Sequence, residues 1–168
     1  MTDQTIKNMW EAFAGESQAN RRYLLFAKKA ADEGLPNIAR LFRAVAESET
    51  IHANNHLEAL KGVKSTAENL ESALTGEADE FTSIYPMFMD QAKRDANNEA
   101  LKSFFWANEA EKTHGRFYER ALDVNKQGED LALKELHICS ICGYTVEGAP
   151  PDKCPTCGQS KDKFKLVE

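Results

Sequence analysis

The first 126 residues contain no cysteine and only two of the chain's five prolines, and the whole chain of 168 residues has nine glycines. Collagen-like and low-complexity chains contain far more glycine and proline, so both classes are excluded. With 42% hydrophobic and 29% charged residues, the chain is not wholly disordered either. No run approaches the roughly 18 uncharged apolar residues that span a bilayer, so we expect no membrane contact.

The chain also lacks an excess of positive charge, with 21 basic and 27 acidic side chains and a formal net charge of −6. Such a chain binds nucleic acid poorly, so we expect no nucleic-acid partner. The first 13 residues lack the basic start and apolar run of a signal peptide, which predicts a cytoplasmic location. Thiols stay reduced there, so the four cysteines need an explanation other than disulfides.

Four long amphipathic segments with short connections predict an all-α, antiparallel four-helix bundle. Pro36 suits the first turn of the second segment, and Ser65 with Glu68 predicts a capping box at the start of the third. Pro86 lies inside the third segment and should bend it. The expected helices cover residues 3–33, 36–61, 65–94 and 97–124.

The composition changes sharply towards the C-terminus, where all four cysteines and three of the prolines lie. We therefore predict a helical domain over residues 1–126, a linker over 127–135 and a small four-cysteine domain over 136–168. A piece this short cannot build a sufficient core by itself, and a bound metal would supply the missing stability.

Two acid–histidine pairs have i, i+3 spacing, Glu49 with His52 and Glu111 with His114. Residues three apart share a face of a helix, so each pair points a carboxylate and an imidazole in one direction. Both pairs lie on or beside apolar stripes and should face the bundle core. One such pair alone is common on helices and would carry little weight.

The other two helices also carry inward glutamates, Glu16 in the first segment and the Glu77 and Glu80 pair in the third. Buried carboxylates that converge repel one another unless positive charge lies among them. Two metal ions would supply that charge, and carboxylate oxygen with imidazole nitrogen suits iron or manganese. Spacing alone leaves open whether Glu80 is a ligand or a solvated acid outside the ligand set.

An internal repeat supports the metal hypothesis. A shift of 62 residues places Glu49 and His52 on Glu111 and His114, and a shift of 61 places Gly15-Glu16 on Gly76-Glu77. Two helix hairpins, each carrying half of the ligands, would form a site with approximate twofold symmetry. One glutamate from each of two helices and a Glu-x-x-His pair from each of the others is the ligand set of di-iron carboxylate bundles.

The cysteines form two Cys-x-x-Cys turns, Cys139 with Cys142 and Cys154 with Cys157, separated by eleven residues. Two such turns bring four thiolates to one tetrahedral centre, which takes zinc or a single iron. The ligand type alone does not decide between the two metals, and a purely structural zinc ribbon stays possible.

Together these motifs resemble the rubrerythrin family over essentially the whole chain. The residues that carry the resemblance are Gly15-Glu-Ser-Gln-Ala19, the paired Glu-x-x-His segments, Gly76-Glu-Ala-Asp-Glu80, Tyr85-Pro86, Cys139-x-x-Cys-Gly-Tyr144 and Cys154-Pro-x-Cys-Gly158. The resemblance implies a ferritin-like di-iron bundle joined to a C-terminal rubredoxin-like domain that holds one iron on four thiolates.

The resemblance also implies a role for each matching residue. In the family, the glutamate at the position of Glu80 and the histidine at the position of His52 exchange as ligands when one iron changes oxidation state. Tyr23 and Tyr85 match tyrosines near the metals. The implied ligands of an oxo-bridged di-iron centre are Glu16, Glu49, His52, Glu77, Glu80, Glu111 and His114, and those of the mononuclear iron are Cys139, Cys142, Cys154 and Cys157.

The activity implied by the resemblance is a non-haem di-iron peroxidase that reduces hydrogen peroxide to water in oxidative-stress defence. Electrons from NAD(P)H would arrive through a reductase or rubredoxin partner and pass the thiolate-bound iron. Family members are typically homodimers in which one chain's rubredoxin domain lies near the other chain's di-iron centre. The alternatives are a ferritin-like ferroxidase that handles iron and a zinc-ribbon binding module on a structural bundle.

Overall fold

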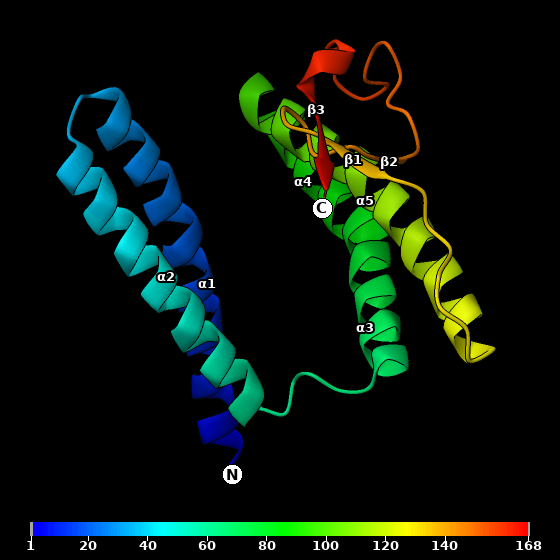
Figure 1. The fold of residues 1–168 in the computed structure, drawn as a ribbon, viewed down its shortest axis with the longest axis horizontal. Helices are drawn as coiled ribbons and strands as arrows, with labels where there is room; N and C mark the ends of the chain where they lie inside the picture. Colours follow the sequence, from blue (N-terminus) through cyan, green and yellow to red (C-terminus); the bar gives the residue numbers. More distant parts are fainter. Residues whose placement is uncertain (1, 168) are drawn as a thin grey trace. The chain divides into compact units, whose positions relative to one another are not determined.

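The computed structural model describes residues 2–167 of the chain (Figure 1). These residues form two compact units, which divide between Lys64 and Ser65. The elements confirm the predicted fold class, because long helices are followed by a small ribbon that carries the four cysteines. Within the described residues, no helix is sufficiently long and apolar to cross a bilayer.

The first unit is a hairpin of two helices, α1 (Asp3–Asp32) and α2 (Pro36–Ala59). The Thr2 side chain caps α1, and Pro36 begins α2 as expected. Small side chains let the two helices approach closely, because every buried position on them is alanine. The buried alanines are Ala19, Ala27, Ala30, Ala39, Ala46 and Ala53.

The second unit begins with α3 (Thr66–Asp79), whose capping box between Ser65 and Glu68 is present as predicted. It continues through a π-helical turn, η1 (Glu80–Ile84), into α4 (Tyr85–Arg94), and α5 (Asn98–Lys126) returns alongside α3 and α4. α5 ends at Lys126, and Gly128 just beyond it has a left-handed φ of 76° that suits the paired hydrogen bonds from Gly128 N to Asn125 O and from Glu129 N to Val124 O.

The expected single helix over residues 65–94 is therefore interrupted rather than simply bent. Pro86 lacks the N–H that would bond to the carbonyl four residues earlier, and its ring would clash there. The wider turn of η1 precedes it and begins at Glu80 itself. π-helical turns often occur at functional sites.

The C-terminal ribbon is a three-stranded antiparallel sheet made of β1 (Leu136–Cys139), β2 (Thr145–Glu147) and β3 (Phe164–Val167). Its strand order is β2-β1-β3. β2 contacts α5, so the ribbon belongs to the same compact unit as α3, α4 and α5. The domain boundaries predicted around residues 127–135 stay a prediction.

Candidate metal centres

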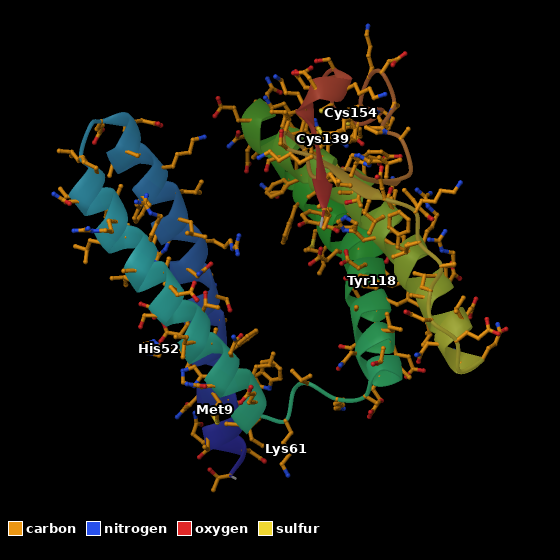
Figure 2. The ribbon with its side chains drawn as sticks, in the orientation of Figure 1. Met9, His52, Lys61, Tyr118, Cys139 and Cys154 are labelled. Atoms are coloured by element: carbon orange, nitrogen blue, oxygen red, sulfur yellow. The ribbon has the colours of Figure 1, made fainter. Side chains whose placement is uncertain are left out.

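Three of the predicted ligands come together in the first unit. Glu16 projects from α1, and Glu49 and His52 project from α2, with one ligand atom of each within 4.8 Å of the others. His52 Nδ1 lies 3.0 Å from Glu49 Oε2. The Glu49 side chain is 15% exposed and that of His52 is 49% exposed. Figure 2 labels His52 on α2. The i, i+3 spacing thus produces the shared face that the sequence predicts.

The matching triad in the second unit has the same chemistry. Glu77 projects from α3, and Glu111 and His114 project from α5, again with ligand atoms within 4.8 Å of one another. His114 Nδ1 lies 2.6 Å from Glu111 Oε2 and 3.7 Å from Glu77 Oε2. Each helix pair therefore presents two carboxylates and one imidazole.

The electrostatics of the second triad favour a cation. Burial, and then the neighbouring Glu111 carboxylate, raise the pKa of Glu77 to about 7. Glu77 Oε2 is buried and has no hydrogen-bond partner. In the first triad, hydrogen bonds from His52 and then Glu16 lower the pKa of Glu49. A metal ion would give Glu77 Oε2 a partner and would place positive charge beside its carboxylate. The residues of the triad therefore fit a bound metal ion.

Glu80 lies beside the second triad but outside it. Its ligand atoms are not among those gathered within 4.8 Å, although burial and the Glu77 charge raise its pKa. The pKa of Tyr85 is also raised, by burial and by the charges of Glu80, Glu111 and Glu77. The negative charge of the triad therefore acts on both side chains. The assignment of Glu80 as a ligand stays a prediction.

The four cysteines are gathered at the end of the ribbon, where Figure 2 labels Cys139 and Cys154. Cys139 Sγ lies 3.7 Å from Cys157 Sγ, and Cys142 Sγ lies 3.5 Å from Cys154 Sγ. These separations exclude disulfides. They fit a tetrahedral centre, whose metal–sulfur bonds of about 2.3 Å require sulfur atoms about 3.8 Å apart.

The backbone of the knuckles is arranged to hold thiolates. Burial opposes ionisation of Cys139, but the N–H groups of Ile141 and Cys142 bond to its sulfur and lower its pKa overall. Burial raises the pKa of Cys142 and Cys157. A bound metal reverses that preference because it deprotonates the thiols that coordinate it.

No sequence pattern marks the residues that join the ribbon to α5. Thr145 Oγ1 lies 3.1 Å from His114 Nε2, and Arg120 Nη2 donates to Glu147 Oε2 at 2.6 Å. Trp106 packs against the cysteine cluster. A lone threonine and a lone arginine have no spacing pattern, so only the folded chain shows these contacts.

The Glu77→Gln variant should stabilise the metal-free protein. At pH 8, above its raised pKa of about 7, the Glu77 carboxylate is ionised beside Glu111, and its Oε2 atom has no hydrogen bond. An amide would be neutral and could donate to Glu111. We expect the free energy of unfolding of the metal-free chain to rise by about 1 kcal/mol, measured by urea denaturation. Glu71→Gln, an exposed glutamate on the same helix, is the matched control and should change little. An unchanged or lower free energy of unfolding for Glu77→Gln would contradict the conclusion that the ionised Glu77 carboxylate destabilises the metal-free protein.

Family models match both parts of the chain. The Rubrerythrin model matches residues 7–122, and the model described as "Rubrerythrin, rubredoxin-like domain" matches residues 137–165. The first match spans both triads, and the second spans all four cysteines.

Curated relatives match along nearly their whole length. Rubrerythrin-2 of Clostridium acetobutylicum is 37% identical over 92% of this chain and 91% of its own. Nigerythrin of Nitratidesulfovibrio vulgaris is 34% identical over 95% of this chain and 85% of its own. Rubrerythrin of Porphyromonas gingivalis is 34% identical over 98% of this chain and 90% of its own.

Solved structures of nigerythrin also resemble the chain. The partially reduced state matches with a TM-score of 0.57 and 32% identity, and the fully reduced, all-ferrous state with 0.57 and 31%. Each match covers 99% of this chain and 88% of the other. The predicted cofactors, a di-iron centre and a metal on four cysteine thiolates, are those of this family, and the donor sets found here fit both. The chain belongs to the rubrerythrin family.

Proposed function

We propose that the protein reduces hydrogen peroxide to water at a di-iron site, with electrons delivered through the four-cysteine centre, in defence against oxidative stress. The observation that carries the proposal is that one chain holds both the carboxylate–histidine ligands and the four cysteines, and that contacts within the chain link the second triad to the cysteine ribbon. The ribbon touches α5, and Thr145 of β2 hydrogen-bonds to His114 of the second triad. Storage of iron has no need for a dedicated thiolate centre in contact with a carboxylate site.

The reaction requires two electrons and two protons for each peroxide, because H₂O₂ + 2 e⁻ + 2 H⁺ gives 2 H₂O. A pair of ferrous ions, when bound, supplies both electrons in one encounter. Each triad offers two carboxylates and one imidazole, and we propose that these residues hold the iron. Their carboxylates would offset the positive charge of the metals, which rises on oxidation.

Two groups beside the second triad suit this chemistry. Tyr85 keeps its phenolic proton because its pKa is raised, so it stays a hydrogen-bond donor next to the carboxylates. We propose that Glu80 would serve as a further carboxylate ligand of the metals. Its place at the start of η1 and its raised pKa in the field of Glu77 support this role, because added positive charge would draw it in as a carboxylate.

Electrons would enter through the ribbon. In this proposal a reductase or rubredoxin partner, itself reduced by NAD(P)H, supplies them to the four-cysteine metal. Cys157 is partly exposed, whereas the other three cysteines are buried. The edge of the centre at Cys157 is therefore the nearest point for an external donor.

Stopped-flow mixing of the iron-loaded, fully reduced protein tests the proposal. We expect hydrogen peroxide to oxidise the carboxylate-bound iron at least about tenfold faster than oxygen at equal concentration, which is roughly 1.4 kcal/mol in activation free energy. The thiolate iron should then be oxidised in a following phase, visible as its coloured ferric form. Faster oxidation by oxygen would instead favour a ferroxidase and contradict the peroxidase assignment.

A further inference from the structure

The Thr145 hydroxyl lies between the two donor sets. Its residue is only 9% exposed, and Oγ1 lies 3.1 Å from His114 Nε2 and 3.2 Å from the carbonyl oxygen of Gly143. Gly143 directly follows Cys142. Two hydrogen bonds therefore connect the knuckle of the four-cysteine centre with the imidazole of the second triad.

The direction of these bonds follows from their partners. A carbonyl oxygen can only accept, so the Thr145 hydroxyl donates its proton to Gly143. Its oxygen is then the acceptor for His114, whose Nε2 must carry a proton. The other ring nitrogen, Nδ1, faces Glu111 and Glu77. A cation that displaces the proton shared by Nδ1 and Glu111 would find the Nδ1 lone pair already directed at it.

We infer that Thr145 is a positioning residue, which holds His114 with Nε2 protonated and Nδ1 free to bind metal, and which ties that histidine to the four-cysteine centre of its own chain. The inference rests on the proposed metal role of His114, but not on peroxide as the substrate. Hydrogen bonds of this kind orient metal-binding histidines and raise their basicity.

Contacts other than the Thr145 hydroxyl also hold the ribbon on α5. The effect of removing the hydroxyl can therefore be separated from the effect of detaching the ribbon. Arg120 donates to Glu147 Oε2, and the backbone N–H of Lys134 donates to Glu147 Oε1 at 2.9 Å. Trp106 packs against the cysteine cluster. Loss of the Thr145 hydroxyl alone should therefore leave the ribbon in place.

The surroundings offer His114 few substitutes for Thr145. A cavity of about 280 Å³ adjoins both residues, and its walls are mainly apolar. They include the side chains of Leu70, Phe117 and Leu133. A water molecule that entered after loss of the hydroxyl would find few further partners, so it would hold the imidazole less firmly.

Zinc-loaded protein with ¹⁵N-labelled histidine provides the test, because Zn²⁺ is diamagnetic and can load both donor sets. We expect a slowly exchanging Nε2–H signal from His114 in the wild type, assigned by its loss in His114→Gln. Thr145→Val keeps the side-chain volume but removes the hydroxyl. It should speed exchange of this proton at least about tenfold and weaken Zn²⁺ binding at the carboxylate site about tenfold. Thr145→Ser should restore both.

Arg120→Ala is the control for docking alone, because it removes a ribbon contact but not the hydroxyl, and it should leave the His114 signal unchanged. An unchanged signal and affinity in Thr145→Val would overturn the inference. If that variant does not fold, the wild-type spectrum decides, since a His114 protonated on Nδ1 with Nε2 bare would also overturn it. Wild-type protein that binds no Zn²⁺ through His114 would overturn the underlying metal role. A protein that shows the expected signals but does not reduce peroxide would support the inference and contradict only the proposed function.

Discussion

The Glu111→Ala variant should lose both iron ions of the carboxylate site while it retains the metal of the four-cysteine centre. Glu111 lies at the middle of the second triad, with its Oε2 atom 2.6 Å from His114 Nδ1 and its side chain 15% exposed. Without it, Glu77 and His114 provide two donors from different helices, too few for a stable site. Metal analysis should show a fall from about three to about one metal ion per chain, since binding depends on ligand number.

The same loss is expected from Glu49→Ala, because Glu49 occupies the matching position in the first triad. Glu109→Ala is the matched control for both. Glu109 lies on the same helix two residues before Glu111, but it pairs with Lys112 and belongs to neither triad. The visible spectrum of the thiolate-bound iron should be identical in all three variants. Retention of two further iron ions by Glu111→Ala would show that Glu111 is not a ligand.

Local patterns in the sequence predicted much of this site. The i, i+3 spacing of Glu49 with His52 and of Glu111 with His114 needs only helical geometry to bring each pair together, and the structure shows this. Glu16 and Glu77 were predicted as inward glutamates and supported by the repeat, and each lies within 4.8 Å of the acid–histidine pair on the neighbouring helix. The capping box at Ser65 and the start of α2 at Pro36 likewise depend on a few adjacent residues, so they could be read directly.

Features that depend on contacts between distant segments could not be read in this way. The π-helical turn at Glu80–Ile84 was missed because Pro86 predicts a disturbance but not its form. The bond between His114 and Thr145 joins residues 31 positions apart and has no periodic signature. For the same reason, the sequence could not show that the cysteine ribbon packs on α5. The resemblance to a family suggested a partner chain there, and the folded chain shows a contact within its own second unit.

Removal of the metal from the four-cysteine centre should unfold the ribbon while the helices persist. The three strands have only four, three and four residues. The buried apolar residues at the ribbon's centre are the ligands Cys139, Cys142 and Cys154 themselves. Without a metal, little apolar surface is buried to offset the loss of chain entropy. Metal binding to such small sites contributes roughly 10 kcal/mol, which exceeds the stability of a ribbon this size.

The Cys142→Ser variant makes this prediction measurable in the full chain. Hydrogen exchange should become fast at the backbone amides of β1, β2 and β3, while far-UV circular dichroism retains most of its helical signal. Ser140→Ala is the control, because Ser140 is exposed in the same knuckle and is not a ligand. Since Thr145 lies on β2, unfolding of the ribbon should also free His114 Nε2, so the two metal sites should prove coupled. Protected strand amides in a variant that binds no metal at this centre would show that the ribbon folds without it.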